Sequence, residues 1–249
     1  MKKGVAVLAL AVAATACNRA PAADTPQAGT PAAATPTAGR APAVSDAPGA
    51  GRPRVVFIGT SLTAGLGLDP DSAYPAVVGR LAERAGTPIA VVNAGLSGET
   101  SAGALRRVDW VLRQPADVVV VETGANDGLR GQSVDSLRAN LDAILRRVRQ
   151  AQPRARVALV QMEAPRNMGR DYTARFHDAF PAAAKAAGVP LLPFLLDGVA
   201  GDPALNQPDG VHPTAEGARR VASNVWKGLA PLLPAPQSAG AAERVAGQG

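Results

Sequence analysis

The chain has 249 residues, of which 26 are Lys or Arg and 20 are Asp or Glu, giving a formal net charge of +6. Aromatic residues make up only 3% of it, too few to stack nucleic-acid bases or sugar rings. Paired arginines such as Arg106-Arg107 are expected on solvated helix faces, so no nucleic-acid partner is expected. The single cysteine excludes an intramolecular disulfide.

The first 17 residues have the features of a bacterial export signal. Lys2 and Lys3 precede an unbroken run of small and apolar residues, which is too short to cross a membrane as a helix. The run ends in Ala14-Thr15-Ala16-Cys17, which resembles the lipobox of bacterial lipoproteins. We expect Cys17 to be lipidated and to become the new N-terminus; the alternative is an ordinary signal peptide followed by an incidental thiol.

Two further segments lack the pattern of a folded core. Residues 18–52 are dominated by Ala, Pro, Thr and Gly without apolar periodicity, which predicts an extended, disordered tether, and residues 234–249 predict a disordered tail. The folded domain is expected at residues 53–233. A lipid anchor on Cys17 would provide its membrane contact in the bacterial cell envelope, on the periplasmic side, and Asn18 favours the outer membrane if the cell has two membranes.

Within the expected domain, short apolar runs alternate with longer amphipathic ones, a pattern typical of strands and helices around a parallel sheet. The strand runs are continuously apolar, which suits a sheet covered by helices on both faces. A three-layer α/β/α fold is therefore predicted. The strands are expected at residues 54–58, 89–93, 117–122, 156–161 and 190–193.

Two helices carry apolar stripes at helical spacing, which predicts that these stripes face the core. The first stripe consists of Val134, Leu137, Leu141, Ile144, Leu145 and Val148, and the second of Ala218, Val221, Val225 and Leu229.

Four predicted loops carry polar or glycine residues and should converge, because parallel strands end at one edge of the sheet, where ligands bind. The loops contain Gly59-Thr60-Ser61-Leu62, Asn93-Ala94-Gly95, Gly124-Ala125-Asn126-Asp127 and Asp209-Gly210-Val211-His212.

These loops contain a serine and the two side chains that could activate its hydroxyl as a nucleophile. A serine hydroxyl becomes reactive when an imidazole accepts its proton and a carboxylate orients the imidazole, roles that Ser61, His212 and Asp209 can fill. The other histidine, His177, lies in a helical pattern and is expected to pack or to face solvent. Asp127 is interpreted as structural.

Acyl transfer also needs donors for the oxygen that becomes negative. Three candidates are the backbone N–H of Ser61, a backbone N–H that approaches the ligand at Gly95, and the neutral side-chain amide of Asn126.

With these motifs in this order, the chain resembles the SGNH or GDSL hydrolases, and among them the bacterial thioesterase, lysophospholipase and arylesterase group. The resemblance runs from about residue 54 to residue 233 and includes the segments 93–100, 126–131 and 209–214. It implies a flavodoxin-like sheet of order 2-1-3-4-5 and no cofactor. It also implies that Ser61 is the nucleophile of a triad with Asp209 and His212, and that Ser61, Gly95 and Asn126 form the oxyanion hole.

The sequence departs from this family at Thr60, where the family usually has Asp. A threonine hydrogen-bonds locally but makes no charged contact, so a less rigid nucleophile loop and a lower rate are expected. Because Thr60 transfers no proton, the assignment of the nucleophile is unaffected.

Two rival chemistries fit less well. An α/β-hydrolase elbow needs Gly at the second position after the nucleophile, where this chain has Thr63. A zinc enzyme needs more ligands than one suitable histidine and no usable cysteine can supply, so no metal site is expected.

The substrate is expected to be a small-molecule ester or a lysophospholipid, with thioesters as further substrates in vitro. Met162, Met168 and Tyr172, after the fourth strand, could form an apolar wall for an acyl chain, or the methionines could simply fill gaps in packing. A carbohydrate O-deacetylase and a non-catalytic acyl-binding lipoprotein are the alternatives. The protein is expected to be a monomer.

Overall fold

The computed structural model describes residues 51–233. The predicted signal peptide, Cys17, residues 18–50 of the predicted tether and the predicted tail lie outside the described residues. Five parallel strands form one sheet in the order β2-β1-β3-β4-β5, which confirms the expected topology. The strands are β1 (Arg54–Gly59), β2 (Ala90–Gly95), β3 (Val118–Val121), β4 (Arg156–Gln161) and β5 (Leu191–Phe194). The bounds of β4 are as predicted, and those of the other strands differ from the predicted ones by one or two residues.

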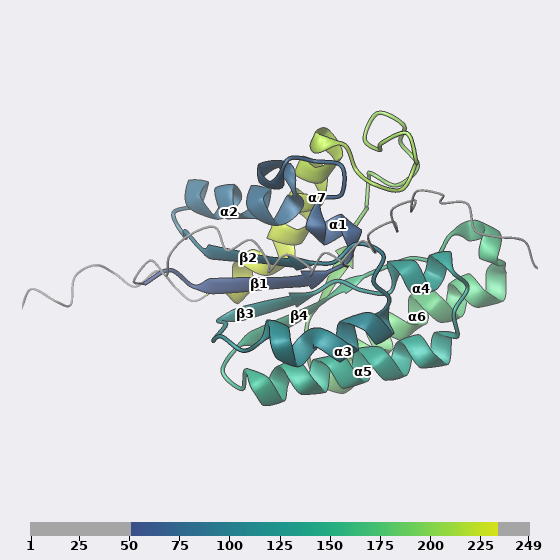
Figure 1. Cartoon of the computed structure of the whole chain (residues 1–249), viewed down its shortest axis with the longest axis horizontal. Helices are drawn as coiled ribbons and strands as arrows, with labels where there is room; N and C mark the ends of the chain where they lie inside the picture. Colours follow the sequence, from purple (N-terminus) through teal and green to yellow (C-terminus); the bar gives the residue numbers. More distant parts are fainter. Residues whose placement is uncertain (1–50, 234–249) are drawn as a thin grey trace, which may run out of the picture. The chain divides into compact units, whose positions relative to one another are not determined.

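Helices cover both faces of this sheet, so the described region has the three layers predicted from the apolar strands (Figure 1). One face carries α1 (Ser61–Ala64), α2 (Tyr74–Arg84) and α7 (Ala215–Leu229). The other face carries α3 (Ser101–Val111), α5 (Val134–Ala151) and α6 (Arg170–Ala187), and the short α4 (Ala125–Leu129) follows β3. Short 3-10 turns occur at η1 (Pro70–Ser72), η2 (Arg166–Met168) and η3 (Ala230–Leu232).

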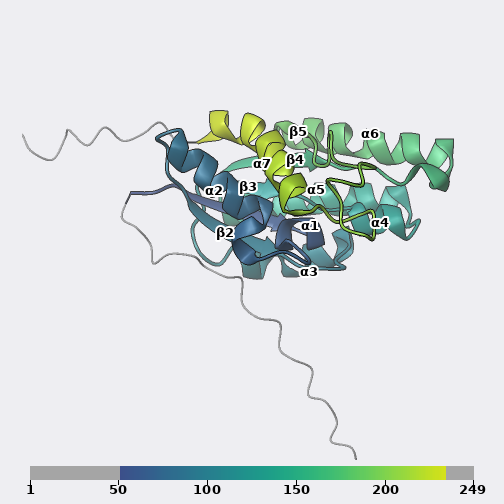
Figure 2. The same cartoon turned by 90° about the horizontal axis from the view of Figure 1, so that it is seen from above.

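The core lies between these layers. All four valines of β3 are buried, as expected for a central strand that helices cover on both sides. The two predicted apolar stripes, on α5 and α7, are also buried. The turned view in Figure 2 shows the helices of both layers running along the sheet. Within residues 51–233, no helix has the length and apolarity that a membrane span requires.

The sheet brings the functional loops together because its strands are parallel. Gly59 at the end of β1 pairs with Gly95 at the end of β2, and β3 and β4 continue in parallel on the other side of β1. The segments after these strands therefore leave from the same edge.

Candidate active site

The short turn from β1 into α1 positions Ser61. Thr60 is the N-cap of α1, and Ser61 is the first residue of the helix. The helix stops after one turn because Gly65 adopts a left-handed conformation (φ 74°) and its N–H donates to the carbonyl of Ser61. A Cβ at Gly59 would lie 1.9 Å from Thr63 Oγ1, so the turn needs glycine there. Ser61 is thus held rigidly at the start of the helix.

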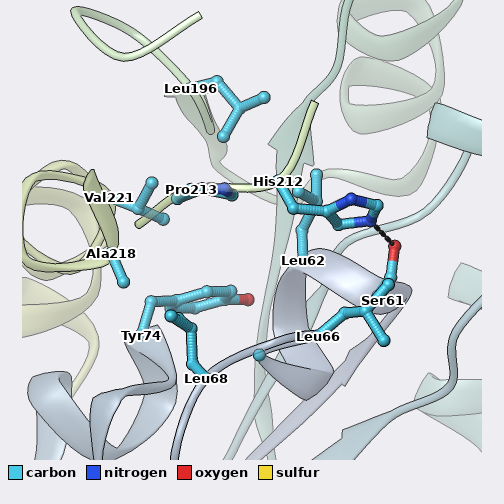
Figure 3. Close-up of a pocket in the computed structure, with 11 residues that line it drawn as sticks. Ser61, Leu62, Leu66, Leu68, Tyr74, Leu196, His212, Pro213, Ala218 and Val221 are labelled. Carbon is cyan, nitrogen blue, oxygen red and sulfur yellow. Dashed lines mark hydrogen bonds between the residues drawn. The ribbon is translucent and has the colours of Figure 1, made fainter. Parts of the chain in front are cut away.

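Ser61, His212 and Asp209 are joined in series, as the sequence predicted. His212 Nε2 lies 2.9 Å from Ser61 Oγ (Figure 3). On the other side of the ring, His212 Nδ1 lies 2.6 Å from Asp209 Oδ2. A proton on Nδ1 donates to the carboxylate and leaves Nε2 as the acceptor of the serine proton. The His212 side chain is 17% exposed and that of Asp209 is 48% exposed, so the imidazole is shielded while its partner contacts solvent.

The loop between β5 and α7 holds Asp209 in its ionised form. Asp209 Oδ1 accepts hydrogen bonds from the N–H groups of Val211 and His212, both at 2.9 Å. These bonds, with that from the His212 ring, lower the pKa of Asp209 to about 2. The carboxylate therefore stays charged across the pH range in which a histidine works as a base.

Gln207 ties this loop to the loop after α1. Its Nε2 donates to the carbonyl of Leu66 at 2.7 Å and to that of Pro213 at 2.9 Å. The N–H of Gln207 also donates to the carbonyl of His212 at 2.7 Å. The histidine loop and the serine loop are consequently cross-linked through one side chain, which fixes the Ser61–His212 distance.

Glu122, at the end of β3, is a functional residue that the sequence analysis did not single out. Its side chain is fully buried and accepts from the Thr60 N–H at 2.8 Å, from the Thr60 hydroxyl at 3.0 Å and from the Thr63 hydroxyl at 2.9 Å. Thr60 is therefore anchored to a carboxyl group after all, with the hydroxyl as donor. The expected loss of rigidity is thus offset, because Glu122 binds both sides of the serine turn. A lone acidic residue after four valines was the signal available in the sequence.

Glu122 should give the protein a distinctive pH dependence. Burial raises its pKa above the usual 4.5. From about pH 4.5 up to the raised folded-state pKa, the native protein then binds more protons at this site than the unfolded chain does, so the free energy of unfolding falls as the pH rises. Glu122→Gln removes this contribution. Urea unfolding from pH 4 to pH 8 should show the wild type losing stability relative to the variant as the pH increases.

The exposed Glu83→Gln is the matched control for this experiment. A stability difference between the wild type and Glu122→Gln that stays constant across the pH range would contradict the prediction.

Asn126, a predicted oxyanion donor, lies on the segment that follows β3. It lies in the first turn of α4, after Gly124, which has φ 100°. Its Nδ2 donates to the carbonyl of Glu99 at 2.9 Å, which holds the side chain against the loop after β2. The second hydrogen of the amide remains to be donated.

Gly95 does not fit the donor role that the sequence suggested. Its N–H donates to Asn93 Oδ1 at 3.0 Å, and a Cβ at this position would lie 2.2 Å from the backbone N of Ala64. The glycine therefore permits close packing between β2 and α1. Gly98 is a better candidate, because it lies on the same loop with φ 76° and its N–H has no hydrogen-bond acceptor among residues 51–233.

Gly95→Ala tests the packing role, because it keeps the N–H and adds only a methyl group. We expect the methyl group to force α1 away from β2, at a cost of about 1–3 kcal/mol. The melting temperature should fall by about 2–4 °C for each kcal/mol in a domain of this size. Thermal unfolding followed by circular dichroism measures this, and an unchanged melting temperature would show that the close approach is unimportant.

An apolar cleft of about 880 Å³ is lined in part by Leu62, the residue after Ser61. Leu62 and Leu196 line both this cleft and the small pocket that contains Ser61 and His212 (Figure 3). Of the residues proposed for the acyl wall, Met162 lines the cleft. Met168 instead lies against Gly131, and Tyr172 donates to the carbonyl of Gln132 at 2.8 Å. Neither is among the residues that line the cleft.

Two residues set aside in the sequence analysis are placed as expected. His177 is half-exposed on α6 and bonds through Nδ1 to Glu163 Oε1 at 2.7 Å. The buried Asp127 accepts from the N–H and the hydroxyl of Ser101, which joins α4 to the start of α3.

A serine, a histidine and a carboxylate linked in series at the carboxyl edge of a parallel sheet define an α/β serine hydrolase. Residues 57–220 match the model of the GDSL-like lipase/acylhydrolase family, and the chain belongs to this family. The resemblance noted in the sequence is confirmed, and the chain is an ester-hydrolysing enzyme. This outcome favours an enzyme over a non-catalytic acyl-binding lipoprotein.

Several esterases are similar to this chain. The chain is 38% identical over 181 residues to esterase TesA of Pseudomonas aeruginosa, covering 72% of this chain and 89% of that protein. It is 37% identical over 180 residues to thioesterase 1/protease 1/lysophospholipase L1 of Escherichia coli K12, covering 72% and 84%. A solved structure of the Pseudoalteromonas esterase EstA matches with a TM-score of 0.68 and 30% identity, covering 72% of this chain and 98% of that chain.

Proposed function

We propose that this protein hydrolyses carboxyl esters through an acyl-enzyme on Ser61, with His212 as the general base and Asp209 as the carboxylate that orients it. The observation that carries the proposal is the pair of hydrogen bonds on His212, at 2.9 Å to Ser61 Oγ and 2.6 Å to Asp209 Oδ2. This arrangement gives the imidazole one donor and one acceptor in the required directions.

The reaction takes place in two acyl transfers. Ser61 Oγ attacks the carbonyl carbon while its proton passes to His212 Nε2, and Asp209 stabilises the imidazolium. The tetrahedral intermediate collapses as the alcohol leaves with the proton from His212. Water then attacks the acyl-enzyme, again giving its proton to His212, and the acid product leaves as the proton returns to Ser61.

The negative oxygen of each intermediate binds three donors: the N–H of Ser61, the N–H of Gly98 and the side-chain amide of Asn126. The Ser61 N–H and the Gly98 N–H have no acceptor within residues 51–233, and the Glu99 carbonyl orients the amide. All three are neutral, so they stabilise the oxyanion without a titrating charge beside His212.

The acyl chain of the substrate occupies the apolar cleft. Its volume, about 880 Å³, is in the range of small-molecule sites, and Met162, Phe194 and Leu196 contribute to its walls. Small carboxyl esters and lysophospholipids suit such a cleft, and a relative has lysophospholipase in its name. Thioesters are expected to react in vitro by the same steps.

Covalent labelling tests the proposal directly. The protein is incubated with a p-nitrophenyl alkylphosphonate, which should displace nitrophenol, add one phosphonyl group per chain and abolish hydrolysis of p-nitrophenyl esters. Peptide mapping should place the group on Ser61, and Ser61→Ala should remain unlabelled. A label on any other residue, or turnover that survives labelling, would contradict the proposal. Activity confined to acetyl esters would favour an O-deacetylase.

We also propose that the protein is exported and carries a lipid on Cys17. The charged, apolar and lipobox segments of residues 1–17 support this placement. Membrane fractionation tests the anchor. The wild type should remain with the membranes, whereas Cys17→Ser should be released from the membrane fraction.

A further inference from the structure

A second cavity lies beside the proposed oxyanion hole, between the loop after β2 and the end of α4. It has a volume of about 460 Å³ and is called the arginine cavity here. The residues that line it are Leu96, Ser97, Gly98, Glu99, Thr100, Gly103, Arg106, Arg107 and Arg130. It thus shares Gly98 with the proposed oxyanion hole.

The arginine cavity has an uncompensated positive charge. Arg107 is neutralised by Glu99, through bonds of 2.7 Å from Nε and 2.6 Å from Nη2. Within residues 51–233, neither Arg106 nor Arg130 forms an ion pair with an acidic side chain. Arg130 Nη2 donates to the carbonyl of Gly98 at 3.0 Å, which orients its guanidinium and leaves further N–H groups free.

The apolar cleft and the arginine cavity are lined by consecutive residues at the end of α4. Leu129 lines the apolar cleft, whereas the next residue, Arg130, lines the arginine cavity. Asn126 lies in the same short helix and is bonded to the Glu99 carbonyl of the arginine cavity. An ester has two arms, and an acyl arm in the apolar cleft leaves the arginine cavity for the alcohol arm.

We propose that the arginine cavity is a subsite for a phosphate group on the alcohol arm of the substrate, with Arg106 and Arg130 as its ligands. This inference rests on the proposed function. Guanidinium groups bind phosphate oxygens through charge-assisted, often bidentate hydrogen bonds. The subsite therefore selects anionic glycerophosphate esters over neutral esters with the same acyl chain.

The test compares two soluble substrates, 1-hexanoylglycerol 3-phosphate and 1-hexanoylglycerol, with the full chain. The measured quantity is the ratio of their kcat/KM values. The wild type should favour the phosphate ester, and Arg106→Gln combined with Arg130→Gln should lower the ratio by about tenfold or more, since hydrogen bonds to charged groups are the strong ones. Arg146→Gln with Arg220→Gln, at exposed positions that line neither cavity, is the matched control.

Arg106→Gln alone controls for a displaced loop after β2. Arg106 makes no side-chain hydrogen bond within the described region, whereas Arg130 bonds to the carbonyl of Gly98. Arg106→Gln should still lower the ratio. Inorganic phosphate should inhibit the wild type competitively and the double variant more weakly. An unchanged ratio in both variants would overturn the subsite. An effect of the arginine substitutions that is seen only when the substrate is in anionic vesicles would also overturn it, because the arginines would then bind a membrane surface.

The proposed function is checked separately in the same experiment. Hydrolysis of the neutral ester that is lost in Ser61→Ala would support the serine mechanism even if the phosphate preference is absent. If neither substrate is hydrolysed, the proposed function is overturned. A failed subsite and a failed function therefore give different results.

Discussion

Ser61→Ala should lower kcat for p-nitrophenyl butyrate by about 10⁶-fold, because the proposed acyl-enzyme forms on the Ser61 hydroxyl. KM should change little, since the methyl side chain leaves the apolar cleft intact. His212→Ala should cause a loss of similar size, because Nε2 is the only acceptor on Ser61 Oγ among residues 51–233. The double variant should be no slower than either single variant, because the serine and the histidine act as one unit.

Steady-state kinetics with all three variants and the wild type measure this prediction. Ser223→Ala is a suitable control, since within the described part of the chain that hydroxyl bonds only to the carbonyl of Arg219 on α7. A reduction of only tenfold in Ser61→Ala would show that the nucleophile is elsewhere. Multiplicative losses in the double variant would show that the serine and the histidine do not act together.

The fold and the triad could be predicted from the sequence because they depend on local patterns. Continuous apolar strands and amphipathic helices fix the layers, and parallel strands bring their following loops to one edge. Asp209 and His212 lie three residues apart in one loop, so only their approach to Ser61 depended on the fold.

The roles that the sequence could not assign depend on contacts between distant elements. Gly95 is a glycine because the backbone of Ala64 approaches it, and nothing in its own loop reveals that contact. The family's usual Asp is missing at position 60, and Glu122, 62 residues further along the chain, supplies a carboxyl group that bonds to Thr60 instead. Met168 and Tyr172 follow the correct strand, but Met168 lies against Gly131 and Tyr172 bonds to the carbonyl of Gln132, so neither lines the cleft.

Asn126→Ala should lower kcat by about 10²–10³-fold, corresponding to about 2.7–4 kcal/mol of lost transition-state stabilisation. KM should stay nearly constant, because the amide donates fully only when the carbonyl oxygen becomes negative. Asn126→Asp should be at least as damaging, since an isosteric carboxylate removes the donor and places a like charge beside the oxyanion. Steady-state kinetics of both variants test this.

Asn126 also holds the Glu99 carbonyl, so a control must separate the missing donor from a displaced loop after β2. Asn140→Ala is the matched control: it removes an amide that donates to Ser101 Oγ at 2.9 Å on the neighbouring α3, and it should leave kcat nearly unchanged. Melting temperatures of the two variants should fall by similar amounts. Equal losses of kcat in both variants would assign the effect of Asn126 to packing, and a loss confined to Asn126 supports the oxyanion role.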